Sequence, residues 1–267
     1  MPRALAIIPA RLSSSRLARK MLLEAGGLPL FAHTVRNAQS SGAFARVVLA
    51  TDSDEILERA RSLGIEALPT RVEHASGTER IHEAWQALRR AGEQAEVVVN
   101  VQGDEPELDP RDLAALVAAF GDARVRAATL AAPLSDPAQA ASPHVVKVVA
   151  DRNGDALYFS RAAIPADGHP RTENAPRPDK TIHRRHVGVY AFAPAALEQF
   201  CALPRGEHEM RENLEQLRWL EAGEKMRVVP ATRAPEGIDT QADFERFVER
   251  LRLRTGPSWL ERGKQEA

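Results

Sequence analysis

Short apolar runs alternate with helical periodicity through the first half of the chain. Three runs, Ala4 to Ile8, Arg46 to Ala50 and Val97 to Val101, have the length and apolar character of buried strands. Helices are predicted between and after them, one from near Pro29 to Gly42 and others after Asp52, Ser76 and Asp109-Pro110. This alternation favours a mostly parallel sheet with helices on both faces.

Capping signals mark where two of these helices begin. Asp52 with Glu55, and Ser76 with Glu79, resemble capping boxes, in which side chains satisfy the free backbone N–H groups of a first helical turn. The apolar positions that follow Ser76 at helical spacing are Ile81, Trp85 and Leu88. We therefore expect the second of these helices to bury that face.

The second half of the chain has a less regular pattern. Its predicted strands are Val145 to Val149, Ala156 to Phe159, His186 to Phe192 and Met226 to Val229. One helix is predicted around Met210, Leu214 and Leu217, and a last one follows a capping box of Thr240 and Asp243. Together the two halves predict a three-layer α/β/α sandwich with a mixed, mostly parallel sheet.

Composition narrows the class of protein. With 267 residues, 43% of them hydrophobic, the chain can bury a large core, and we expect a single domain. The net charge of −1 argues against a nucleic-acid partner. The single cysteine, Cys201, excludes an intramolecular disulfide and is expected to be buried and inert. No stretch approaches the ~18 apolar residues of a membrane span, and no secretory signal is evident, so we expect a cytoplasmic protein without membrane insertion.

Acidic residues follow the predicted strand that ends at Val101. Gly103 and Asp104 come directly after it, at the carboxyl edge of the sheet, where open α/β folds bind ligands. Asp104 is therefore a candidate metal ligand. The alternative is a plain turn with a solvated carboxylate.

The loop after the first strand gathers four cations. It runs from Pro9 to Lys20 and carries Arg11, Arg16 and Arg19 among small residues. Small residues let backbone N–H groups approach phosphate oxygens, while arginine and lysine supply charge, so a triphosphate would suit this loop. A basic, solvated turn is the alternative. Neither the dinucleotide fingerprint nor the Walker loop occurs in the chain.

Taken together, these motifs make nearly the whole chain resemble the 3-deoxy-manno-octulosonate (KDO) cytidylyltransferases, or CMP-KDO synthetases. The motifs that carry the resemblance are Ile8 to Arg11, Ala50 to Asp52, Thr70-Arg71, His74 to Arg80, Asn100 to Pro106, Val146 to Val149, Ala156 to Arg161, His186 to Tyr190, Leu214 to Arg218 and Gly237 to Thr240. The resemblance implies a Rossmann-like nucleotidyltransferase fold. It also implies that CTP and KDO react to CMP-KDO and pyrophosphate for the inner core of lipopolysaccharide.

The resemblance assigns the catalytic and phosphate-binding residues. Asp104 and Asp239 would hold Mg²⁺, and Arg11, Arg16 and Lys20 would bind the triphosphate, with Lys20 also counted as catalytic. From the residues alone, Asp239 could instead be a helix N-cap. The chain departs from the family at Ala18-Arg19, where relatives usually carry Pro-Gly, and this change removes a rigid turn and adds a cation next to Lys20.

The resemblance also divides the remaining site residues between the two substrates. The residues implied for cytosine and ribose are Ala50, Thr51, Arg71, Ser76 and Gln102. Those implied for the sugar acid are Gln102, Arg161, His186, Tyr190, Glu215 and Gln216. Period-two spacing places His186, Gly188 and Tyr190 on one strand face.

Purely structural roles are the alternative for most of these positions. Ser76 could serve only as a helix cap, and Arg161 could form an ordinary surface ion pair. His186 could lie on the surface while Tyr190 packs in the core. Without the resemblance, the sequence would place Glu215 and Gln216 on a solvent-exposed helix face.

Three questions of substrate and assembly follow. An 8-amino variant of KDO or another acid sugar is the nearest alternative substrate, and a non-catalytic nucleotide-binding protein is the alternative from another class. The resemblance implies a homodimer, with a nucleotide-binding part over about residues 1–135 and a sugar-binding and dimerisation part over about 136–255. The segment Pro165 to Lys180, rich in proline and charge, is expected to be a mobile loop.

Overall fold

The central sheet runs through both halves of the chain. The computed structural model describes residues 1–13, 16–166 and 183–255, and within them the main path of the sheet has the order β11-β7-β10-β6-β1-β4-β5. Its strands are β1 (Ala4–Ala10), β4 (Arg46–Thr51), β5 (Ala67–Pro69), β6 (Val97–Asn100), β7 (Ala127–Pro133), β10 (Arg184–Phe192) and β11 (Arg227–Pro230). Only β10 runs antiparallel to its neighbours on this path, so the prediction of a mixed, mostly parallel sheet is confirmed.

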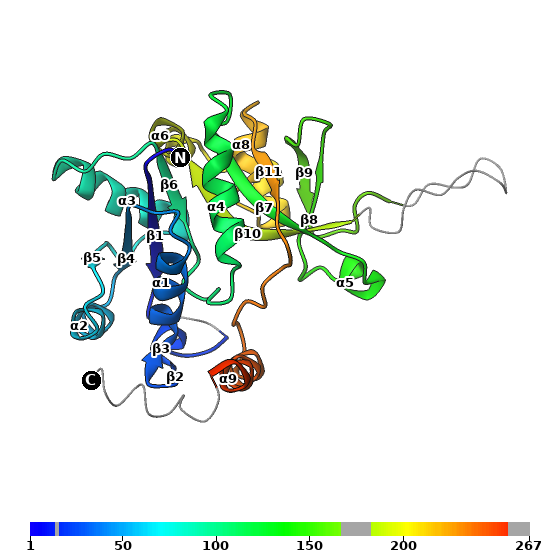
Figure 1. Cartoon of the computed structure of the whole chain (residues 1–267). Helices are drawn as coiled ribbons and strands as arrows, with labels where there is room; N and C mark the ends of the chain where they lie inside the picture. Colours follow the sequence, from blue (N-terminus) through cyan, green and yellow to red (C-terminus); the bar gives the residue numbers. More distant parts are fainter. Residues whose placement is uncertain (14–15, 167–182, 256–267) are drawn as a thin grey trace, which may run out of the picture.

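Two smaller strand pairs extend this frame. β8 (Lys147–Ala150) pairs with the outer end of β10 and with β9 (Ala156–Ser160), which places this hairpin beyond the parallel core of the sheet (Figure 1). β2 (Glu24–Ala25) and β3 (Leu28–Pro29) form a separate two-stranded hairpin.

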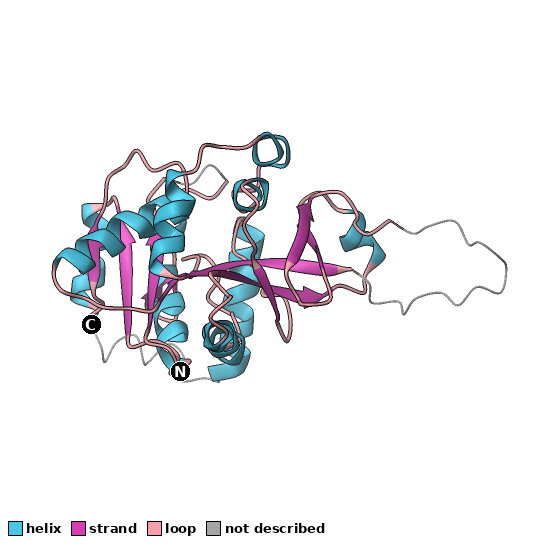
Figure 2. Ribbon diagram, turned by 90° about the horizontal axis from the view of Figure 1, so that it is seen from above, coloured by secondary structure: helices cyan, strands magenta, loops and turns pink. Residues whose placement is uncertain are grey.

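Helices cover both faces of the sheet, as the view from above shows (Figure 2). They are α1 (Leu30–Ser40), α2 (Asp54–Ser62), α3 (Gly77–Arg90), α4 (Pro110–Ala118), α5 (Pro137–Ala141), α6 (Pro194–Ala202), α7 (Glu207–Glu212), α8 (Leu217–Glu221) and α9 (Gln241–Thr255), with 3-10 turns η1 (Lys20–Leu22) and η2 (Ala119–Gly121). Alternate residues of β1 point to opposite layers. Ile8 packs in the cluster that contains Phe31 of α1, whereas Ile7 packs with Trp85 of α3. The three-layer arrangement follows from this alternation.

The capping predictions are partly correct. Ser76 caps α3, because its hydroxyl accepts a hydrogen bond from the backbone N–H of Glu79. The prediction for Asp52 is wrong, since Ser53 is the N-cap of α2 and accepts from the N–H of Ile56. Asp52 is instead engaged by Arg80, a contact between distant parts of the chain.

The single helix predicted around Met210, Leu214 and Leu217 is also wrong. Asn213 adopts a left-handed conformation, with φ of 51°, and ends α7 before α8 begins. Met210 is 61% exposed, so it is not part of an apolar stripe. Because of this break, the two residues after Leu214, which are Glu215 and Gln216, point toward the interior of the protein.

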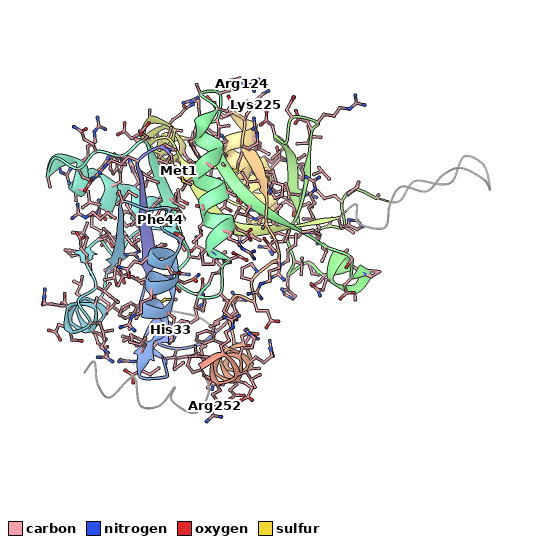
Figure 3. All side chains as sticks on the ribbon, in the orientation of Figure 1. Met1, His33, Phe44, Arg124, Lys225 and Arg252 are labelled. Carbon is pink, nitrogen blue, oxygen red and sulfur yellow. The ribbon has the colours of Figure 1, made fainter. Side chains whose placement is uncertain are left out.

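A third, smaller core attaches α9 to the start of α1. Phe244 and Phe247 of α9 pack with Leu30. His33, labelled in Figure 3, meets Phe247 edge-on and has Nε2 2.8 Å from the carbonyl oxygen of Ala25 in the hairpin. This core fixes the end of the connection from β11 to α9, which carries Asp239.

Other expectations concern single segments. Cys201 is half-buried rather than fully buried, and burial raises the pKa of its thiol to about 12, so the thiol stays protonated. Most of the loop predicted at Pro165 to Lys180 lies outside the described residues. Within the described ranges, no helix is long and apolar enough to cross a membrane.

Candidate active site

A pocket opens where β1 and β6 end. Residues of the loop after β1, of the segment that starts α3, of the turn after β6 and of the connection to α9 line it together. Its lining is Pro9, Arg11, Ser13, Arg16, Lys20, Met21, His74 to Gly77, Arg80, Gln102 to Asp104 and Asp239. This is the carboxyl edge of the parallel strands, where such sheets bind ligands.

Two carboxylates meet at one ammonium group in this pocket. Nζ of Lys20 lies 2.6 Å from Oδ2 of Asp104 and 3.1 Å from Oδ1 of Asp239, and Arg16 lies 2.9 Å from the same Asp239 oxygen. Lys20 is buried, at 7% exposure, whereas Arg16 is largely exposed. The two acids and two cations that the sequence singled out are thus brought together.

Backbone contacts hold the two acids in place. The N–H of Ile238 donates to the carbonyl oxygen of Asp104 at 3.0 Å, which ties the connection before α9 to the turn after β6. That turn approaches β1 so closely that a Cβ at Gly103 would lie 2.8 Å from the carbonyl oxygen of Pro9. Only glycine therefore fits beside Asp104.

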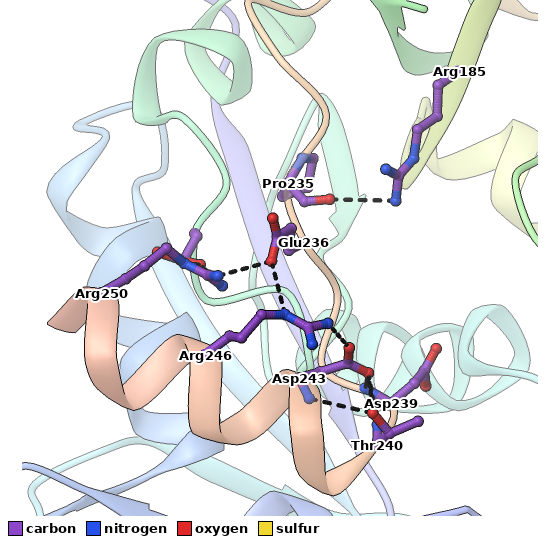
Figure 4. A network of polar contacts seen from close by, with 9 residues as sticks. Arg185, Pro235, Glu236, Asp239, Thr240, Asp243, Arg246 and Arg250 are labelled. Atoms are coloured by element: carbon purple, nitrogen blue, oxygen red, sulfur yellow. Dashed lines mark hydrogen bonds and ion pairs between the residues drawn. The ribbon is translucent and has the colours of Figure 1, made fainter. Parts of the chain in front are cut away.

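Asp239 is not the cap of α9. Asp243 accepts from the backbone N–H groups of Asp239 and Thr240, and the hydroxyl of Thr240 accepts from the N–H of Asp243, as Figure 4 shows. The predicted capping box is thereby confirmed, and the N-cap alternative for Asp239 is wrong. Its carboxylate is left for the pocket.

The residues implied for the nucleotide divide into two groups. Arg11, Arg16, Lys20, Ser76 and Gln102 line the pocket. Three others are not among its lining residues in the described part of the chain. Ala50 is part of the core, Thr51 accepts the N–H of Ser53, and exposed Arg71 lies 3.5 Å from Glu83.

Arg80 and His74 line the pocket and were not singled out from the sequence. Arg80 is 3% exposed and donates to Oδ2 of Asp52 at 2.7 Å and to the hydroxyl of Thr70 at 2.6 Å. His74 contacts Glu83 through Nε2. Both belong to the motif that carries the Ser76 cap, so motif membership was the available signal.

A second group of polar residues lies buried beneath β10. The hydroxyl of Tyr190 donates to Oε1 of Gln216 at 3.0 Å, and the rings of Tyr190 and His186 lie 5.5 Å apart. Nε2 of His186 is 2.9 Å from the hydroxyl of Thr129. Burial lowers the pKa of His186 to about 3, so its ring is neutral, and the surface alternative for His186 is wrong.

Glu215 and Gln216 belong to this group and not to a solvated helix face. Gln216 is 1% exposed. The hydroxyl of Thr78 donates to Oε1 of Glu215 at 2.7 Å, and burial raises the pKa of that carboxyl. Burial also raises the pKa of Tyr190, with Glu215 and Glu105 adding to the effect. The break at Asn213 is the reason that these side chains point inward.

Arg161 takes a different position. Its guanidinium donates to the backbone carbonyl oxygens of Glu212 at 2.7 Å, of Pro143 at 3.0 Å and of Asn213 at 3.4 Å. The structure therefore gives Arg161 a role in joining β9 to the end of α7. It does not show Arg161 in contact with the rest of the predicted sugar site.

Glu105 is a further residue that sequence reasoning missed. Burial, followed by the charge of Asp104, raises the pKa of its carboxyl to about 8. Its Oε1 lies 4.0 Å from where a Cβ at Gly188 would stand, so glycine leaves room beside it. Among the described residues, four buried side-chain polar atoms lack a hydrogen-bond partner, and three of them are Oε2 of Glu105, Oε2 of Glu215 and Nε2 of Gln216. Such atoms need a ligand or water to satisfy them.

The acids of the pocket suit one kind of metal site. Within the described residues, no group of three or more histidine, cysteine or acidic side chains could hold a metal ion. Asp104 and Asp239 offer two carboxylates, and Mg²⁺ in proteins is commonly held by one or two carboxylates together with substrate phosphates. The donor set thus fits Mg²⁺ bound with a nucleotide rather than a cage built by the protein alone.

The fold and this pocket define a cytidylyltransferase, and residues 5–226 match the family described as "Cytidylyltransferase". Relatives named 3-deoxy-manno-octulosonate cytidylyltransferase include one from Nitratidesulfovibrio vulgaris strain Hildenborough. It is 48% identical over 94% of this chain and 96% of its own. Another, from Methylococcus capsulatus strain Bath, is 48% identical over 93% and 97%.

A solved structure of CMP:2-keto-3-deoxy-manno-octonic acid synthetase complexed with CTP is 35% identical, with a TM-score of 0.84, covering 94% of this chain and 99% of that one. The chain belongs to the 3-deoxy-manno-octulosonate cytidylyltransferase family.

Proposed function

We propose that the protein transfers CMP from CTP to the anomeric hydroxyl of KDO, giving CMP-KDO and pyrophosphate. The observation that carries this proposal is the meeting of Asp104 and Asp239 at Lys20, at the mouth of the basic loop. The relative solved with CTP covers the same stretch of chain. As in that family, the product would serve the inner core of lipopolysaccharide.

The nucleotide is expected to bind with its triphosphate over the loop after β1. Arg11, Arg16 and Lys20 all line the pocket and would neutralise the charge that develops on the departing pyrophosphate. Asp104 and Asp239 would hold Mg²⁺, which when bound makes the α-phosphorus more electrophilic and the attacking hydroxyl more acidic. In the structure Lys20 balances the charge of these acids.

The sugar acid is expected to bind next to the buried polar group under β10. Glu105 and Glu215 each offer an unpaired oxygen that can accept from a hydroxyl, and Gln216 offers an unpaired N–H donor. A polyhydroxylated acid supplies both kinds of partner. A ligand without the matching hydroxyls would leave these atoms unsatisfied, which is the basis for strong discrimination.

A coupled pyrophosphate assay tests the proposal. KDO, 8-amino-KDO and a sialic acid are each offered with CTP or UTP, with and without Mg²⁺. Release that requires CTP, KDO and Mg²⁺ supports it, whereas preference for the amino sugar keeps the chemistry and changes the substrate. If folded protein releases no pyrophosphate in any combination, the proposal is contradicted and a non-catalytic nucleotide-binding protein is supported.

The assembly and location implied by the family are part of the same proposal. We expect a cytoplasmic homodimer formed through residues within about 136–255, and sedimentation velocity checks the dimer. A monomer at micromolar concentration with full turnover would separate assembly from activity.

A further inference from the structure

Two fully buried side chains, Thr78 and Asn100, connect the pocket with the polar group under β10. Both are 0% exposed. Nε2 of Gln102 donates to Oδ1 of Asn100 at 3.4 Å, Nδ2 of Asn100 donates to Oγ1 of Thr78 at 3.1 Å, and Thr78 donates to Oε1 of Glu215 at 2.7 Å. We call these four residues the buried polar row. Only Gln102 among them lines the nucleotide pocket.

The direction of every hydrogen bond in the row follows from its last member. Oε1 of Glu215 accepts from Thr78, so the hydroxyl of Thr78 spends its single proton there. Thr78 can then only accept from Asn100, which must turn its NH₂ group toward it. The carbonyl oxygen of Asn100 consequently faces Gln102 and selects the NH₂ group of that side chain. The Glu215 carboxyl group thus sets the orientation of the Gln102 amide at the other end of the row.

We propose that Thr78 and Asn100 are positioning residues, which hold the Gln102 amide and the Glu215 carboxylate in one mutual orientation and so set the nucleotide pocket and the sugar site together. The inference rests on the proposed function for the identity of the sugar. It assigns no contact with substrate to Thr78 or Asn100 themselves.

The packing around the row supports a positioning role. A Cβ at Gly77 would lie 3.4 Å from Oε1 and 3.5 Å from Nε2 of Gln102, so the amide packs closely against the start of α3. With Nε2 turned to Asn100, Gln102 keeps its carbonyl oxygen as an acceptor for a ligand. At the other end, Oε1 of Glu215 is occupied by Thr78, and only Oε2 remains without a partner.

The ligand chemistry follows from these free atoms. Both remaining atoms, the carbonyl oxygen of Gln102 and Oε2 of Glu215, are acceptors, and they need a ligand that donates N–H or O–H protons at each end of the row. A sugar with several free hydroxyls meets this requirement, whereas a second nucleotide phosphate, which offers only acceptors, does not. Thr78 contacts Glu215 directly but reaches Gln102 only through Asn100, so loss of its hydroxyl should affect the sugar more than CTP.

The first test compares Thr78→Val with Thr78→Ser. Valine keeps the shape but removes the hydroxyl, and we expect the KM for KDO to rise at least tenfold while the dissociation constant for CTP changes less than threefold. Serine keeps the hydroxyl and should restore the KM to within threefold of the wild type. Thr232→Val is the matched control, because Thr232 also donates to a buried carboxylate, Oδ1 of Asp112 at 2.8 Å, away from the pocket.

The second test reads the row without substrate. In nitrogen-15 NMR spectra, the side-chain NH₂ signals of Asn100 and Gln102 should both shift in Thr78→Val, although Gln102 does not touch Thr78, and neither should shift in Thr232→Val. Unmoved Gln102 signals, a KDO KM within twofold of the wild type in Thr78→Val, or no rescue by serine would each overturn the proposal. A wild type that is inactive with CTP and KDO would overturn the proposed function, and the spectra would still decide the row.

Discussion

Asp104 and Asp239 share one counter-ion, the buried ammonium of Lys20, which lies 2.6 Å from the first carboxylate and 3.1 Å from the second. The acids come from distant parts of the chain and are joined by the backbone bond from Ile238 to Asp104. Two neighbouring carboxylates repel each other, and a cation that contacts both offsets this repulsion. Lys20 therefore supplies the positive charge that lets the two acids lie together in the pocket.

Asp104→Asn is expected to remove turnover while leaving the fold intact. The substitution keeps the shape of the side chain and removes its charge, so the Mg²⁺ proposed to bind there would lose a ligand and kcat should fall by a factor of roughly 100 or more. Turnover with CTP and KDO measures the loss, and isothermal titration with Mg²⁺ in the presence of CTP should show weaker binding. Asp54→Asn, on the exposed first turn of α2, is the control. Unchanged turnover and Mg²⁺ binding in Asp104→Asn would contradict the metal assignment.

Lys20→Ala is expected to weaken the binding of CTP more than the binding of CMP. The ammonium would contact the β- and γ-phosphates, which CMP lacks, so we expect at least a tenfold loss for CTP and less than threefold for CMP. Equilibrium titration of both nucleotides gives the comparison. Lys225→Ala is a surface control, because Lys225 (labelled in Figure 3) is exposed and pairs with Asp155 at 3.4 Å, and neither residue lines the pocket. Equal losses for the two nucleotides would argue against a phosphate role.

The elements that the sequence predicted correctly are those set by local periodicity. The strand at Val97 is visible in a local run of β-branched residues and the Ser76 cap in residues three positions apart, and the structure has both. The cap predicted at Asp52 was wrong because Arg80 takes that carboxylate from elsewhere in the chain. The break at Asn213 was missed because helical spacing continues across it while the backbone does not.

The candidate site, like the fold, was predictable only in part. Lys20 and Asp104 stood out because unusual charge follows a strand, and the resemblance supplied Asp239. Glu105 gave no signal of its own, because its burial depends on β10 packing over it with Gly188 opposite. Thr78 likewise reads as an ordinary residue in the first turn of a helix, since its partners come from other parts of the chain.

Arg250→Met is expected to destabilise the protein through α9. Arg250 donates to Oε2 of Glu107 from Nε at 2.8 Å and from Nη2 at 2.5 Å, and it also pairs with Glu236, as Figure 4 shows. Glu107 is 6% exposed and would lose its main partner. Breaking a buried pair typically costs about 3–5 kcal/mol, and we expect about 2 kcal/mol because Arg254 still reaches Glu107 at 3.2 Å.

Urea unfolding measures this loss and separates its cause. Adding Glu107→Gln to Arg250→Met removes the stranded charge and should restore part of the stability. Arg124→Met is the control, because Arg124 pairs with Asp122 at the exposed surface, and its loss should leave the urea midpoint almost unchanged. A double variant no more stable than Arg250→Met would show that side-chain packing, and not the buried charge, explains the effect.

His186→Gln is expected to flatten the acid side of the stability profile. Burial holds the pKa of His186 at about 3, against about 6.5 in an unfolded chain. Between these values the unfolded chain binds a proton that the folded protein does not, so this residue makes stability fall as the pH drops below about 6.5. The contribution approaches about 1.4 kcal/mol per pH unit.

Urea unfolding at pH 7, 6 and 5 tests the sign. The stability of the wild type relative to His186→Gln should decrease by about 2 kcal/mol from pH 7 to pH 5. His144→Gln, at an exposed position, should leave the slope of the wild type unchanged. If stability depends on pH in the same way in the wild type and in His186→Gln, the ring gains a proton in the folded state as well. The assignment of a neutral His186 under β10 would then be wrong.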